Sequence, residues 1–151
     1  MSFPNLTHVS PHLRWTELAC RDAKRTPYPS EWRDRAVLLA TEFEALRARC
    51  GGVPLVILSA FRTPAHNARV GGAAKSYHVQ GLALDLQTRA GWSVDEFFAI
   101  VRDQARARGP RGERLSAIRG LGKYPWGVHV DLRPGDKFVI WHGTSTPFVG
   151  E

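Results

Sequence analysis

Two short segments of alternating polarity constrain the fold of this chain most. In LALDL, at positions 82–86, the leucines face one side of an extended backbone and Asp85 faces the other. GVHVDLR, at positions 127–133, repeats the pattern and places His129 and Asp131 together on its polar face. Each segment therefore predicts a strand that packs one face on a core and presents chemically active groups on the other.

Two further segments have the spacing of amphipathic helices. Residues 30–50 carry apolar side chains at every third or fourth position, with Ser30 as the predicted N-cap and Gly51-Gly52 as the stop. The second helix begins with a capping box at Ser93 and ends near Gly109. Both helices have an apolar face with which to cover a sheet.

Three other segments are apolar and bounded by turn residues, as strands are, and they lie at 53–61, 116–122 and 137–143. The first is a continuous apolar run, which predicts a buried strand that leaves the core between Ser59 and Arg62. Residues 63–77 are rich in Gly, Ala and Asn, and they predict a surface connection with one helical turn after Pro64.

The order of these elements predicts the fold class. Of the 151 residues, 43% are hydrophobic, which is enough for one buried core. No repeat or low-complexity linker divides the chain. We expect an α+β fold, in which a single domain spanning residues 1–151 has a mainly antiparallel sheet flanked by helices.

The chain is strongly basic, with a formal net charge of +7. Such a charge attracts polyanions, which include nucleic acids, anionic membranes and anionic polymers of bacterial walls. The densest basic stretch, residues 102–114, contains no aromatic residue on which bases would stack. We therefore expect no nucleic-acid partner, whereas anionic wall polymers are compatible with the charge.

The cysteines and the hydrophobic runs limit the environment of the chain. Cys20 and Cys50 are the only cysteines, too few for a disulfide framework and not paired as a thiolate metal motif, so both are expected to pack as small apolar residues. No signal peptide or membrane span is visible. We expect synthesis in the cytoplasm, and action on a cell wall only after release or export by another factor.

His78 and Asp85 form the first part of a candidate metal site. A histidine at the end of a glycine-rich loop is followed seven residues later by a carboxylate on a strand, a spacing that permits both to reach one ion. Zinc binds imidazole nitrogen and carboxylate oxygen, and catalytic sites usually have three protein ligands. His129 is the best candidate for the third. The alternative is structural: a loop cap, an ion pair with an arginine, and a hydrogen-bonded strand histidine.

A ten-residue motif supports the metal site. SYHVQGLALD, at positions 76–85, has the form S-x-H-x-x-G-x-A-x-D. It resembles the hallmark of the D-alanyl-D-alanine carboxypeptidase-like zinc peptidases, which share their metal-site plan with lysostaphin-type endopeptidases and the hedgehog signalling domain. SAFRTPAHN upstream and GLGKYPWGVHVDLR downstream are similar to other parts of the family pattern. The resemblance covers nearly the whole chain.

The resemblance implies a hedgehog-like or D-Ala-D-Ala peptidase-like fold and one zinc ion held by His78, Asp85 and His129. It also implies that Arg62 lies beside the substrate, where its guanidinium pairs with a carboxylate or stabilises the oxyanion. Ser76 is a predicted substrate-binding residue, and its alternative role is to order the loop backbone.

The general base is the point at which this sequence departs from the family pattern. Several branches of the family have a glutamate three residues before the last histidine, and here that position is Trp126, which we expect to line the substrate groove. Asp131 is the candidate base, because it shares a strand face with His129. Its alternative role is to orient His129 or to pair with Arg133. Two residues of the preceding turn are candidate oxyanion donors, Lys123 and Tyr124.

The predicted function is zinc-dependent hydrolysis of a peptide amide in bacterial peptidoglycan. The chain would act as a monomer, either as an endolysin-type endopeptidase or as a D-Ala-D-Ala carboxypeptidase. The alternative is a non-catalytic, zinc-stabilised binding module, which the missing glutamate at Trp126 favours. A basic nucleic-acid binder would instead show salt-dependent DNA binding that survives chelation.

Overall fold

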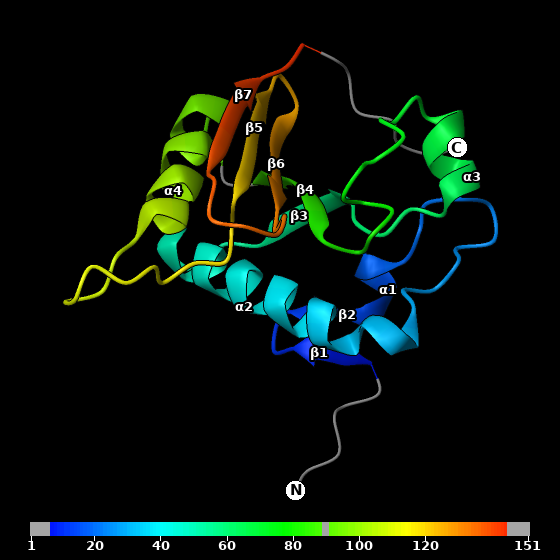
Figure 1. Cartoon of the computed structure of the whole chain (residues 1–151), viewed down its shortest axis with the longest axis horizontal. Coiled ribbons are helices and arrows are strands. Elements are labelled where there is room, and N and C mark those ends of the chain that lie inside the picture. The colour runs from blue at the N-terminus through cyan, green and yellow to red at the C-terminus, as the bar shows by residue number, and fades with distance from the viewer. Residues whose placement is uncertain (1–6, 89–90, 145–151) are drawn as a thin grey trace, which may run out of the picture.

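A five-stranded sheet forms the centre of the computed structural model, which describes residues 7–88 and 91–144 (Figure 1). Its strands are β3 (Leu55–Ser59), β4 (Ala83–Thr88), β5 (Gly120–Tyr124), β6 (Gly127–Asp131) and β7 (Val139–His142). They lie in the order β3-β4-β6-β5-β7. All neighbours are antiparallel except β5 and β7, which are parallel. The sheet is thus mainly antiparallel, as predicted.

The helices lie on both sides of this sheet. They are α1 (Trp15–Leu18), the 3-10 turn η1 (Ser30–Trp32), α2 (Arg33–Arg49), α3 (Pro64–Arg69) and α4 (Val94–Arg106). α4 packs against β4, β5 and β6, and α2 packs against α4 and against a small hairpin formed by β1 (His8–Ser10) and β2 (Leu13–Arg14). In Figure 1, α3 lies across the sheet from α4. The architecture is the predicted α+β fold with flanking helices.

The helix ends show which local signals decide structure here. α4 begins with the predicted capping box, in which Ser93 Oγ accepts a hydrogen bond from the Glu96 amide at 3.1 Å and the Glu96 carboxylate accepts one from the Ser93 amide at 3.2 Å. The prediction that Ser30 caps the first helix is wrong. Pro29 holds an extended backbone, and Ser30 is the first residue of the 3-10 turn that leads into α2. The predicted stop is confirmed, since Gly51 adopts a φ of 78° just after α2.

The alternating segments place their apolar residues in the core. Leu84 and Leu86 of β4 and Val128 and Val130 of β6 are almost completely buried in one hydrophobic cluster with α2 and α4. The strand at 82–86 is more buried than the half-buried strand predicted, because Asp85 on the opposite face is also buried. That face is covered by the connection between α3 and β4.

The predicted strand at 116–122 begins only at Gly120. The Ser116 hydroxyl donates to the buried Glu42 carboxylate at 2.6 Å and accepts a hydrogen bond from the Ile118 amide at 3.1 Å. The Ala117 amide donates to the same Glu42 carboxylate at 2.9 Å. These side chains occupy backbone groups that a strand would use, so residues 116–119 remain irregular.

Both thiols agree with the expectation from composition. Cys20 and Cys50 are free and buried within the core, as predicted. Among the described residues, every helix is too short or too polar to traverse a bilayer.

Candidate metal centre

Three potential ligands converge on the polar face of the sheet. Asp85 on β4 lies directly beside His129 on β6 in the strand register, and His78 approaches from the loop before β4. One ligand atom from each residue lies within 4.8 Å of the others. Asp85 Oδ1 is 3.2 Å from His78 Nε2 and 2.9 Å from His129 Nδ1. The group has the size and composition to hold one metal ion.

Main-chain geometry orients the His78 ring. Its Nδ1 lies 2.6 Å from the carbonyl oxygen of Ala60, which can only accept, so Nδ1 carries the proton and Nε2 presents a lone pair towards Asp85. Ala60 follows β3, whose register with β4 shifts between Ile57 and Ser59. Such an irregularity redirects the chain at a functional edge. The end of β3 thus fixes which nitrogen of His78 faces the site.

A buried carboxylate orients His129 in the same way. Asp131 Oδ2 lies 2.9 Å from His129 Nε2, which leaves Nδ1 to face Asp85. Asp131 is 0% exposed, and both of its oxygens accept hydrogen bonds from Arg133, each at 2.8 Å. Of the two predicted roles of Asp131, this geometry favours the one in which it orients His129 and pairs with Arg133. A hydrogen bond to the far nitrogen is the usual support for a metal-binding histidine.

Two glycines of β5 make room for this arrangement. A Cβ at Gly120 would lie 2.3 Å from an oxygen of Asp131, and a Cβ at Gly122 would lie 2.6 Å from the ring of Trp141. Both glycines stand in register with the polar face, Gly120 beside Asp131 and Gly122 beside His129. Only residues without a side chain allow the carboxylate and the indole to lie flat on the sheet.

The loop that carries His78 is ordered by its own motif residues. The hydroxyl oxygen of Ser76 accepts a hydrogen bond from the His78 amide at 3.2 Å. Gly81 has a φ of 68°, and a Cβ there would lie 2.8 Å from the Trp32 ring and from the Tyr28 hydroxyl oxygen. The Tyr28 hydroxyl donates to the Gly81 carbonyl at 2.7 Å. Ser76 lines the pocket, and the contact seen is its alternative role of ordering backbone.

Arg62 reaches the metal group from the end of β3. Its Nη2 is 3.5 Å from Asp85 Oδ2, while Nε donates to Ser59 at 3.1 Å and Nη1 donates to Asn67 at 3.2 Å. Asn67 in turn donates to the carbonyl of Ala73 at 2.8 Å. Three contacts therefore hold the guanidinium beside the metal group. This position is compatible with the substrate-side role that the family resemblance implies.

Aromatic side chains form the opposite wall of the pocket, whose volume is about 380 Å³. Tyr124 stacks on Trp126, with ring centres 4.8 Å apart. Trp141 donates from its indole nitrogen to the Tyr124 hydroxyl oxygen at 2.8 Å and lies against the His129 ring. Because the Tyr124 oxygen accepts from Trp141, its own proton is free to point elsewhere in the pocket.

Electrostatics favour anionic carboxylates at the site. Asp85 is buried, which would raise its pKa, but the two histidines lower it well below the ordinary value. For Asp131, burial acts in the same direction and is outweighed by Arg133 and His129, so the pKa is also low. Burial lowers the pKa of His78 and keeps this imidazole neutral. A cation between these groups would meet charged carboxylates and the neutral His78 imidazole, and it would have to displace a proton from His129, whose pKa is raised to about 9.

The structure brings nearly all predicted site residues to this one pocket. Its lining includes the metal group and the predicted catalytic or substrate-binding residues Arg62, Ser76, Trp126 and Asp131, together with the candidate oxyanion donor Tyr124. Lys123 is the exception among the oxyanion donors. It points to the helix face, where it forms an ion pair with Asp95 of α4, so its assignment to the site is wrong.

Several residues that complete the site were assigned no role in it from the sequence. Trp141 lies in the pocket because β7 pairs with β5 in parallel. No local sequence pattern predicts that pairing. Asn67 lies in the SAFRTPAHN segment. Its side-chain amide, five residues after Arg62, was the only feature of the segment that indicated a hydrogen-bond partner for the guanidinium. The small residues Gly120 and Gly122 gave a clearer signal, because two glycines in a strand indicate close packing over it.

The comparisons with known proteins agree with this geometry. The comparison with curated proteins gave no match. The family model of peptidase M15 matches residues 11–131, which include the whole metal group, Arg62 and the aromatic residues of the β5–β6 turn. This match covers most of the chain and confirms the resemblance drawn from its motifs. The chain therefore belongs to the peptidase M15 family.

Proposed function

We propose that this chain is a zinc-dependent peptidase that hydrolyses a peptide amide in bacterial peptidoglycan. One observation carries the proposal: two imidazoles and one carboxylate converge within 4.8 Å, and a hydrogen bond at the far nitrogen of each imidazole turns its near nitrogen towards the site. Membership of a peptidase family supports the reaction class.

The donor set fits zinc. His78 Nε2, His129 Nδ1 and the Asp85 carboxylate offer two nitrogens and one oxygen, a combination that zinc binds with a fourth position left open. Hard cations such as calcium prefer six or more oxygen ligands, which this group does not supply. The ligand atoms lie close enough together for a single ion.

Bound zinc supplies a Lewis acid that polarises the amide carbonyl and activates water. The protein groups around it have separate tasks. Arg62 holds a positive charge beside Asp85, where it can pair with negative charge on the substrate or on the carbonyl oxygen. The Tyr124 hydroxyl, held by Trp141, offers a second donor from the opposite wall. Asp131 keeps His129 in the tautomer that binds metal.

The charge of the pocket supports a carboxylate-rich peptide as substrate. Arg62, Lys75 and Arg133 line the pocket with positive charge, of which Asp85 and Asp131 offset the charge of Arg62 and Arg133 in part. Peptide stems of peptidoglycan carry several free carboxylates. An endopeptidase or a carboxypeptidase would use these cations to hold them. The place of action in this proposal is the bacterial cell wall, reached by release or export through another factor.

The test is hydrolysis of purified peptidoglycan by the zinc-loaded protein, with the released fragments identified by mass spectrometry. We expect cleavage of one amide type, loss of activity after chelation, and recovery when zinc is restored. His78→Ala should bind zinc weakly and be inactive, whereas Arg111→Gln, a change in an exposed loop, should retain activity. Zinc-loaded, folded protein that cleaves no peptidoglycan would contradict the proposal.

A non-catalytic, zinc-stabilised module is the second candidate, and Trp126 at the usual glutamate position favours it. The same samples separate the two functions. A module would bind zinc and peptidoglycan without releasing any fragment, even in a single-turnover experiment with excess protein. A peptidase would release fragments in proportion to its zinc content.

A further inference from the structure

A second and larger pocket lies where α1 meets the start of α2, and it shares no lining residue with the metal pocket. Its volume is about 710 Å³, within the range of small-ligand sites. Trp15 and Tyr28 supply aromatic surface, and Arg21, Arg25 and Arg33 supply guanidinium groups. Nothing in the peptidase chemistry described above uses this pocket.

The three guanidinium groups form no close ion pair within the described residues, although the charge of Glu17 acts on Arg21 and partly offsets the lowering of its pKa by burial. Within residues 7–88 and 91–144, no carboxylate forms an ion pair with Arg21, Arg25 or Arg33. The Glu17 carboxylate is occupied at the helix start, where it accepts a hydrogen bond from the Arg14 amide at 2.9 Å. The pocket therefore carries net positive charge that an anion would neutralise.

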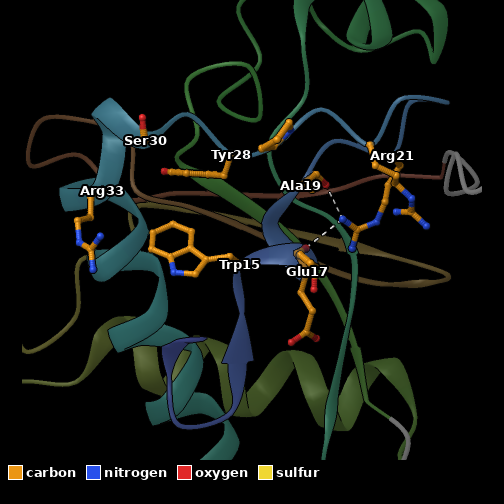
Figure 2. A pocket seen from close by; sticks show the side chains of 10 residues that line it. Trp15, Glu17, Ala19, Arg21, Tyr28, Ser30 and Arg33 are labelled. Atoms are coloured by element: carbon orange, nitrogen blue, oxygen red, sulfur yellow. Dashed lines mark hydrogen bonds between the residues drawn. The ribbon is translucent and has the colours of Figure 1, made fainter. Parts of the chain in front are cut away.

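Arg21 is held in place before any ligand arrives. Its Nη1 donates to the carbonyls of Glu17 at 3.0 Å and Ala19 at 2.5 Å (Figure 2). Its Nη2 donates to the carbonyl of Ile57 at 3.1 Å. Burial lowers its pKa, and so does the nearby charge of Arg25. A fixed cation loses little conformational freedom on binding.

The positive charges lie at the two ends of the pocket. Figure 2 shows Arg21 on one side and Arg33 on the other, with Trp15 and Tyr28 between them. The Arg33 guanidinium lies 5.7 Å from the centre of the Trp15 ring. An occupant that satisfies both ends carries at least two anionic groups separated by an uncharged link.

The pocket lining also offers hydroxyl groups, which suit a link rich in hydroxyls. Thr16 and Ser30 supply them, and the indole of Trp15 in the same lining is half-buried. A single-stranded nucleic acid would need several exposed rings in succession for its bases. Here Tyr28 is buried, and Trp15 alone offers a partly open ring. The lining thus favours a polyol link over nucleobases.

We propose that this pocket binds a phosphodiester-linked polyol chain of the kind found in anionic bacterial wall polymers. Each phosphate accepts paired hydrogen bonds from a guanidinium, which matches the planar donors of arginine. The preference for a spaced polyanion stands on this pocket alone, whereas the choice of a wall polymer rests on the proposed function. Binding here would hold the protein on the wall near its substrate.

The experiment titrates the full chain with short poly(glycerol phosphate) oligomers and measures affinity by calorimetry. The test variant is Arg25→Gln with Arg33→Gln, both exposed positions, and the matched control is Arg111→Gln with Lys137→Gln, which removes the same charge elsewhere. We expect the test pair to weaken binding by tenfold or more and the control pair by less than twofold. Circular dichroism and thermal melts confirm that both pairs fold.

Three results would overturn the proposal. The first is no binding, and the second is an equal loss in the two pairs, which would show attraction by net charge only. The third is an oligonucleotide with the same number of phosphates that binds as tightly and depends on the same two arginines, which would make nucleic acid the occupant.

The outcome is separable from that of the peptidase test. Polymer binding is measured on protein freed of metal by chelation and dialysis, where we expect affinity within twofold of the zinc-loaded protein. A chain that cleaves peptides without binding the polymer overturns this inference alone. A chain that binds the polymer without cleaving peptides contradicts the proposed peptidase alone.

Discussion

At the scale of single residues, His129 decides how metal binding depends on pH. Burial would lower its pKa, but hydrogen bonds to Asp131 and Asp85 outweigh burial and raise the pKa to about 9. The metal-free protein therefore carries a proton on His129 at neutral pH, and a metal must displace it. The pKa of His129 is higher in the folded state than in the unfolded state, so its protonation stabilises the metal-free fold. This stabilisation is complete below about pH 6.5 and is lost as pH rises through about 9.

We predict that zinc affinity increases by about tenfold per pH unit between pH 7 and 9, because one proton is released on binding. Competition titrations against a chelator of known affinity, in buffers of different pH, measure this slope. Calorimetry in buffers with different ionisation enthalpies counts the proton directly. A flat profile over this range would show that His129 is already neutral without metal.

Replacing Asp131 separates its two candidate roles. In Asp131→Asn the carboxylate that holds His129 is gone, and we expect zinc affinity to fall about 10- to 100-fold while most activity returns at saturating zinc. A general base would behave in the opposite way, with zinc affinity kept and kcat lost. Because Asp131 is buried against Arg133, the melting temperature of the variant must be recorded beside both measurements.

The Tyr124 hydroxyl is the donor whose loss should affect chemistry without affecting metal. Tyr124→Phe leaves the ring stacked on Trp126, and we expect kcat to fall about 100-fold with zinc content unchanged. Tyr77→Phe, which removes a hydroxyl elsewhere on the pocket lining, is the matched control and should retain activity. Equal kinetics of the two variants would remove Tyr124 from the mechanism.

At the scale of elements, strand β5 shapes the site because its two glycines have no side chain over the polar face. In Gly120→Ala the added Cβ would lie 2.3 Å from the buried Asp131 carboxylate, and neighbouring strands on both sides prevent β5 from moving away. We expect a loss of about 1–3 kcal/mol in the free energy of unfolding, together with weaker zinc binding as Asp131 shifts. Chemical denaturation and zinc titration measure the two effects.

The control for this prediction is Gly51→Ala. Its φ of 78° makes alanine unfavourable by about 1 kcal/mol, but an added Cβ meets nothing within 4 Å. Zinc affinity should remain that of the unmodified chain. If Gly120→Ala changed stability alone and left zinc affinity intact, Asp131 would not be the link between β5 and the metal group.

Elements with a strong local period were predictable, and those that depend on distant partners were not. Alternation placed Asp85, His129 and Asp131 on one sheet face, and a motif identified His78. The sequence could not show that β7 would join β5 in parallel, because pairing depends on register and not on composition. It also could not show Glu42 drawing residues 116–119 out of a strand, since those groups lie far apart in the chain.

At the scale of the whole molecule, the metal group connects parts of the chain that the sheet alone does not join. His78 comes from the long connection after α3, and Asp85 and His129 come from neighbouring strands. A ligand that binds only the folded state stabilises it, by about 4 kcal/mol when its concentration is 1,000 times Kd. For a chain of this size that amounts to roughly 10 °C in melting temperature.

We therefore predict that chelation lowers the melting temperature of the zinc-loaded chain by roughly 10 °C. Differential scanning calorimetry at fixed protein concentration measures the shift. His78→Ala should melt at the same temperature with and without chelator. A similar shift in that variant would mean that the chelator acts at a different place.

Tyr28 lines the second pocket and also supports the loop that carries His78, and this double role has an evolutionary consequence. Its ring lines this second pocket beside the three arginines, and its hydroxyl donates a hydrogen bond to Gly81 in the loop that carries His78. A substitution at position 28 would therefore change both the second pocket and the support of the His78 loop. Because both effects must be tolerated, this tyrosine should vary more slowly among relatives than exposed neighbours such as Lys24.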